Sequence, residues 1–121
     1  MQLYGPRYRQ YARARLADER LCAEAVEQAL DYLADGWDAV LRCPQPMAVC
    51  WVLLRQVVSD RCRRADRTDR LHRSLPDPAA DAAVLRYRLG LELKSAAHLM
   101  GVEEWAVRAD LRAAARMLDR G

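Results

Sequence analysis

The 121-residue sequence contains no phenylalanine, only five glycines and five prolines, and no long apolar run. The longest uninterrupted apolar stretch, Met47–Leu54, is far shorter than the roughly 20 residues that a membrane-spanning helix needs. No charged head followed by an apolar core and a cleavage site occurs at the N-terminus. We therefore expect a cytoplasmic protein that has no membrane partner.

Lysine is almost absent as well, because 19 of the 20 basic residues are arginine and the formal net charge is only +3. Together with the many alanines, this bias indicates a GC-rich coding genome before it indicates a function. The positive charge is concentrated in six arginines between positions 61 and 73. This cluster fits two interpretations equally: contacts along a phosphate backbone, or a solvated helix end with ion pairs between neighbouring turns.

The four cysteines form no C-x-x-C pair, which favours buried free thiols over disulfides or a zinc site. His72 and His98 lie far apart, and neither has the acid–His or Cys–His spacing of a metal or catalytic site. We therefore expect no enzyme activity, no cofactor, no metal and no small-molecule substrate.

Helical periodicity covers most of the chain, whereas alternating β-branched residues and Asn-Gly or Asp-Gly turns are missing. The sequence predicts an all-α fold with two small domains: a three-helix unit over 1–64 and a smaller unit over 69–121, joined by a short basic linker over 65–68. The helices are expected over 3–16, 19–34, 47–64, 69–75, 78–89, 93–100 and 103–118.

The last two predicted helices are separated by Gly101-Val102, which is the arrangement of a helix-turn-helix. Gly101 stands where the tight turn favours a left-handed backbone, and Ala97, Val107 and Leu111 supply apolar contacts at the required spacing. In such a motif the second helix enters the DNA major groove. A plain helical hairpin with a glycine cap explains the same spacing.

Short motifs in both halves match one known family. In the N-terminal half they are Leu3-Tyr4-Gly5-Pro6-Arg7, Tyr11-Ala12-Arg13, Ala23-Glu24, Gln28, Asp60-Arg61 and Arg63-Arg64. In the C-terminal half they are Leu75-Pro76, Leu85-Arg86-Tyr87, Gly90-Leu91, Ala97, Gly101-Val102-Glu103-Glu104, Val107 and Leu111. With these residues the chain resembles a shortened and degenerate extracytoplasmic-function sigma factor of RNA polymerase. The resemblance implies a sigma region 2-like unit followed by a region 4-like helix-turn-helix.

The resemblance also implies binding to core RNA polymerase, promoter recognition and control by an anti-sigma factor. Glu24 and Gln28 are the candidate partner-binding residues on the polymerase-binding helix. Ala25 and Ala29 stand there where the family has carboxylates, and Asp31 replaces an aromatic residue. Each lost charge-assisted contact would be worth about 1.5–3 kcal/mol, so we expect a much weakened affinity for polymerase.

The DNA-reading helix has also lost residues that the family uses for binding. Its remaining positive residues are Arg108, Arg112 and Arg116, which Glu103, Glu104 and Asp110 nearly cancel, so we expect weak DNA binding. Trp105 stands where the family has glycine, and we interpret it as an interface anchor rather than a core residue. Trp37 and Trp51 are expected in the core. The candidate DNA-binding residues are Arg61, Arg63, Arg64, Arg108, Arg112 and Arg116.

The linker constrains the function. Four to eight residues at about 3.5 Å each span roughly 14–28 Å, less than the turn of duplex, about 34 Å, that separates two promoter elements. We therefore expect the halves to pack together, in a sigma-like transcription regulator that acts mainly through a protein partner, an anti-sigma factor, RNA polymerase or another regulator. The alternatives are a minimal sigma factor that directs polymerase to promoters and a helix-turn-helix DNA-binding regulator.

Overall fold

The computed structural model describes residues 5–64 and 69–120, and within them every regular element is a helix, as the sequence predicts. The first half holds four helices: α1 (Gly5–Leu16), α2 (Glu19–Asp35), α3 (Trp37–Arg42) and α4 (Pro46–Arg64). The short helix α3 was not predicted, because Gly36 and Pro44 leave too few residues between them to show a periodicity. The 65–68 linker, Leu3 and Tyr4 lie outside the described residues.

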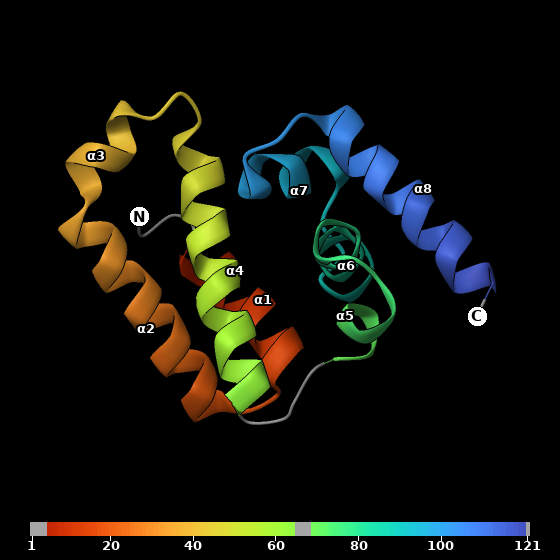
Figure 1. Cartoon of the computed structure of the whole chain (residues 1–121), viewed down its shortest axis with the longest axis horizontal. Coiled ribbons are helices and arrows are strands. Elements are labelled where there is room, and N and C mark those ends of the chain that lie inside the picture. Colours follow the sequence, from red (N-terminus) through yellow and green to blue (C-terminus); the bar gives the residue numbers. More distant parts are fainter. Residues whose placement is uncertain (1–4, 65–68, 121) are drawn as a thin grey trace.

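The second half begins with two short helices, α5 (Arg70–Ser74) and α6 (Asp77–Ala83), and α6 continues into a turn of π-helix, η1 (Val84–Arg88). Helices α7 (Leu93–Met100) and α8 (Glu104–Arg120) follow. In Figure 1, α2 and α4 form one side of the molecule and α6, α7 and α8 form the other, while α1 crosses behind α4.

Apolar residues at helical spacing account for the two long helices of the first half. Helix α2 begins at the cap residue Asp18, whose carboxylate accepts hydrogen bonds from the backbone N–H groups of Arg20 and Leu21. Its buried positions and those of α4 are the ones that the periodicity predicts. They are Cys22, Ala25, Val26, Ala29 and Leu33 in α2 and Cys50, Trp51, Leu54, Val58 and Cys62 in α4.

One hydrophobic core runs through both halves. Tyr11, Leu54 and Val58 from the first half belong to the same buried cluster as Leu85 and Val107 from the second. All four cysteines are free, and only Cys43 is partly exposed. Because the halves share a core, separating them would expose apolar surface at a cost of roughly 25 cal/mol per Å². A smaller cluster seals α6 against α8 and consists of Leu75, Ala79, Ala80, Ala83 and Ala114.

The two halves also approach each other closely at the α7–α8 turn. Gly101 ends α7 in the left-handed conformation, with φ at 71°, as both the helix-turn-helix and the glycine-capped hairpin interpretations predict. A Cβ placed on Gly101 would lie only 2.5 Å from Cα of Ala48, near the start of α4. The turn that precedes α8 therefore packs directly on the backbone of α4.

Candidate interaction site

The outer side of α8 carries one aromatic and three basic side chains. Trp105 is 67% exposed, and Arg108, Arg112 and Arg116 are exposed as well. At 3.6 residues per turn these positions fall on one side of the helix, opposite the buried Val107 and Ala114. We call Trp105, Arg108, Arg112 and Arg116 the α8 stripe. The exposure of Trp105 agrees with an interface residue and excludes a place in the core of this chain.

One acidic residue of α8 lies away from this stripe. Asp110 is only partly exposed, and burial together with the nearby Asp81 carboxylate raises its pKa. It therefore lies on the inner side of α8, away from the stripe. Glu103 and Glu104 are exposed at the start of the helix, and the exposed Asp119 falls on the same side of α8 as the three arginines, so acids still offset part of the charge of the stripe.

The candidate residues near the end of α4 form a separate group. Arg61, predicted to bind DNA, donates hydrogen bonds to Oε2 of Glu24 at 3.0 Å and to Oε1 of Gln28 at 2.7 Å, the two residues predicted to bind a partner. Arg63 and Arg64 are exposed and pair with Asp60, each at 3.3 Å. These contacts favour the ion-paired helix end over a free phosphate-binding cluster.

The two groups do not form one surface. In Figure 1, α4 ends at the bottom of the view, whereas α8 descends along the right-hand side. Arg61, Arg63 and Arg64 therefore do not extend the α8 stripe.

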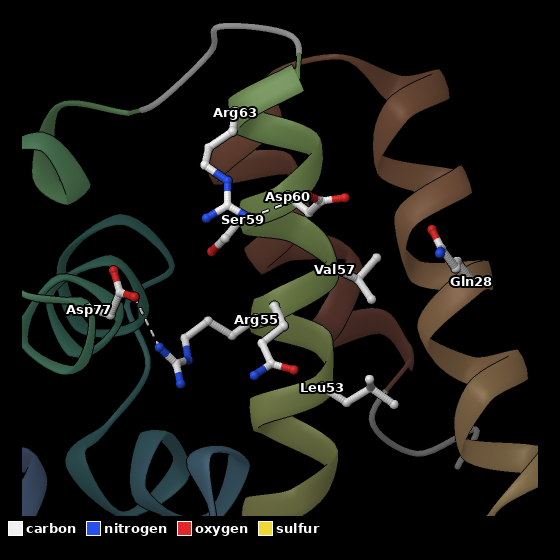
Figure 2. A pocket seen from close by; sticks show the side chains of 9 residues that line it. Gln28, Leu53, Arg55, Val57, Ser59, Asp60, Arg63 and Asp77 are labelled. Atoms are coloured by element: carbon white, nitrogen blue, oxygen red, sulfur yellow. Dashed lines mark hydrogen bonds and ion pairs between the residues drawn. The ribbon is translucent and has the colours of Figure 1, made fainter.

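A polar groove runs beside α4 and leads towards the junction of the halves. It has a volume of about 540 Å³ and includes Arg55, Ser59 and Arg63 in its lining. Figure 2 shows Arg55 reaching from α4 to Asp77 on α6, where Nη1 lies 3.1 Å from Oδ2. The Nε atom of Arg55 lies 3.6 Å from Oδ2 of Asp81, so this arginine connects the groove to a buried acid.

Behind the groove, a chain of buried polar side chains joins the halves. From α1, Tyr11 donates its hydroxyl hydrogen to Oδ1 of Asp81 at 2.6 Å. Arg15 donates from Nη1 to the Tyr11 hydroxyl at 3.0 Å and to Oγ of Ser59 at 2.7 Å, and its Nε lies 3.4 Å from Oδ1 of Asp69. We call the whole group the junction network: Tyr11, Arg15, Arg55, Ser59, Asp69, His72 and Asp81.

His72 lies between the two acids of this network. Its Nδ1 is 2.8 Å from Oδ1 of Asp69, and its Nε2 is 2.7 Å from Oδ1 of Asp81. Burial alone would lower the pKa of His72, but the hydrogen bonds with the two acids outweigh burial and raise it. Burial likewise opposes the ionised form of Asp69, yet its hydrogen bond to His72 and the charges of His72 and Arg15 lower the pKa of Asp69.

Sequence reasoning did not find the junction network. Asp69 caps α5 and His72 follows three residues later, a spacing that was a usable signal, whereas Tyr11 and Asp81 lie 70 residues apart. Among the described residues, no group of three or more His, Cys, Asp and Glu side chains is arranged to hold a metal ion.

No protein-family model, curated protein or solved structure matches this chain. None of the described helices is long and apolar enough to span a membrane.

Proposed function

We propose that this chain is a sigma-factor-like transcription regulator that acts through a protein partner while its two halves stay packed together. The motifs that resemble region 2 and region 4 support the class of protein. The shared core and the junction network support the packed form, because both link α1 and α4 to the second half.

The observation that carries the proposal is the exposed Trp105 on the α8 stripe. A large aromatic side chain that is 67% exposed contributes little to the stability of the free chain, but it is typical of residues that dominate the affinity of a protein interface. Three arginines beside it select for a partner with carboxylates at the same spacing. The anti-sigma factor or polymerase subunit that binds here would therefore present an acidic surface with an apolar pocket.

Affinity capture followed by reconstitution tests this proposal. The chain is used to capture proteins from its native cell extract, and the captured partner is then purified and titrated against the chain. We expect a transcription protein with an acidic surface, bound at least tenfold more weakly by Trp105→Ala, since truncation of an anchor residue costs about 2 kcal/mol or more.

Tyr87→Ala is the matched control, because Tyr87 is equally exposed, at 66%, but lies on η1. This variant should bind the partner as the wild type does, and both variants should keep the wild-type melting temperature. Equal binding by Trp105→Ala and wild type would remove the α8 stripe from the interface and refute the proposal.

Duplex DNA binding by α8 is the second candidate, favoured by the position of Asp110 on the inner side of the helix. Phosphate contacts by the three arginines of the stripe would make affinity fall steeply with salt. In that case Arg108→Ala/Arg112→Ala/Arg116→Ala would abolish binding to duplex DNA, whereas Arg7→Ala/Arg9→Ala/Lys94→Ala, on other exposed sites, would weaken it only slightly. Absence of salt-dependent DNA binding by the wild type excludes this candidate.

A further inference from the structure

His72 bridges two buried carboxylates in a way that fixes its charge. Each ring nitrogen lies within hydrogen-bond distance of an aspartate: Nδ1 contacts Asp69 at 2.8 Å and Nε2 contacts Asp81 at 2.7 Å. A neutral imidazole has one donor nitrogen and one acceptor nitrogen, whereas the imidazolium has two donors. Ionised carboxylates only accept, so both contacts form together with a protonated His72.

The charge of the surrounding cluster leads to the same protonation state. The side chains of Arg15, Asp69, His72 and Asp81 are at most 5% exposed. Their formal charges sum to zero when His72 carries a proton and to −1 when it does not. An uncompensated charge in a buried site is costly, so loss of this proton would destabilise the packed junction.

The other groups around His72 do not supply the missing charge. From α1, Tyr11 faces Asp81 as a neutral donor, and burial keeps its pKa well above the usual range. From α4, Arg55 divides its guanidinium between Asp77 and Asp81 and stays partly exposed, and the Cys62 thiol has its pKa raised by burial. From α8, Asp110 adds a further acid near Asp81. Arg15 balances one of the two buried aspartates, and within this set the His72 proton balances the other.

We propose that the Asp69–His72–Asp81 bridge is a proton-operated latch that holds the two halves together and loosens when His72 loses its proton. Protonated His72 holds both carboxylates in position. Asp69 can then accept a hydrogen bond from Arg15 of α1, and Asp81 can accept one from Tyr11 of α1. Deprotonation removes one of the two N–H donors and leaves an excess negative charge at the junction. Loosening exposes the packed faces of α1 and α4, and it does not depend on the identity of any partner.

The sign of the pH dependence follows from the raised pKa of His72. The stabilisation is fully present below the pKa of an unfolded histidine, about 6.5, and is lost as pH rises through the pKa of folded His72. Asp69 limits the stabilisation at low pH. Its pKa is lowered in the folded chain, so its contribution to stability is lost as pH falls through that lowered value. The latch is therefore strongest at mildly acidic to neutral pH.

Direct titration of the wild-type chain is the first test. The imidazole resonances of His72 are followed by NMR from pH 5 to pH 10 and compared with those of histidine in the unfolded chain. We expect His72 to titrate above the pKa of an unfolded histidine, about 6.5, and to show two slowly exchanging ring protons at neutral pH. A His72 that titrates at or below the pKa of an unfolded histidine would overturn the proposal without any variant being made.

Stability measurements test whether loss of the His72 proton destabilises the folded chain. The unfolding equilibrium constant of the wild type should rise between pH 6 and pH 9, about tenfold for each unit by which the pKa of His72 exceeds that of the unfolded chain. His72→Gln should lack this rise, whereas His98→Gln should retain it. The proposal fails if His72→Gln folds and shows the wild-type pH dependence.

Amide hydrogen exchange shows which helices loosen when His72 loses its proton. After correction for the intrinsic effect of pH, protection in α1, α5 and α6 should fall between pH 6 and pH 9 in the wild type while the interior of α2 stays protected. Uniform protection changes along the chain would place the effect in global unfolding and refute a latch at the junction.

Discussion

At the scale of single residues, the buried hydroxyl of Tyr11 holds a central position. It donates to Asp81 and accepts from Arg15, so one phenolic group connects an acid of the second half to a base of the first. Its ring also packs against Trp51, with ring centroids 4.6 Å apart. Tyr11 therefore belongs to the apolar core and to the polar network at the same time.

Removal of this hydroxyl should be costly although it creates no cavity. Tyr11→Phe leaves Asp81 and Arg15 each without one buried partner, and we expect a loss of about 1–3 kcal/mol in the free energy of unfolding. Urea denaturation at pH 7 measures it. Tyr32→Phe is the control, because Tyr32 is 54% exposed and should change stability by less than about 0.5 kcal/mol. Equal stability of Tyr11→Phe and wild type would show that the hydroxyl contacts contribute nothing.

At the scale of elements, the turn between α7 and α8 fixes how the second half packs on α4. Gly90 and Gly101 share the same positive φ of 71°, but their surroundings differ. A Cβ on Gly90 meets no atom within 4 Å, whereas a Cβ on Gly101 meets the backbone of Met47 and Ala48. The pair separates the cost of backbone conformation from the cost of the contact between the halves.

Alanine substitution at these two glycines gives the matched experiment. Gly90→Ala should cost about 1–2 kcal/mol from left-handed backbone strain alone. Gly101→Ala should cost clearly more, because α4 must also move away from the turn. Thermal unfolding of the two variants compares them, and equal losses would mean that α4 does not pack on this turn as described.

The helices themselves were largely predictable from the sequence, while their contacts were not. Apolar spacing placed α2, α4, α7 and α8 within a few residues of their observed ends, because buried residues recur once per turn. Helix α3 is too short for such a pattern. The inner position of Asp110 follows from helical spacing, because it lies three residues after the buried Val107 and four before the buried Ala114. The pairing of Arg61 with Glu24 and Gln28 depends on the packing of α2 on α4 and cannot be obtained from one-dimensional spacing.

At the scale of the whole molecule, the structure joins the halves through a shared core, a glycine contact and a buried polar network. The sequence led us to expect that the halves pack together, from the length of the linker. Apart from the spacing of Asp69 and His72, it gave no indication of the network, whose members lie up to 70 residues apart. With the halves packed in this way, the exposed α8 stripe is available to a partner while α1 and α4 remain committed to the junction.

Transcription with purified core RNA polymerase tests the central proposal, that the packed chain works through protein contacts rather than by directing polymerase to promoters. Core polymerase is incubated with the chain and with DNA from its own genome, and transcripts are mapped at their 5′ ends. We expect no initiation above that of core polymerase alone, because the packed halves cannot reach two promoter elements together. Reproducible initiation at defined start sites that requires the chain would contradict the account.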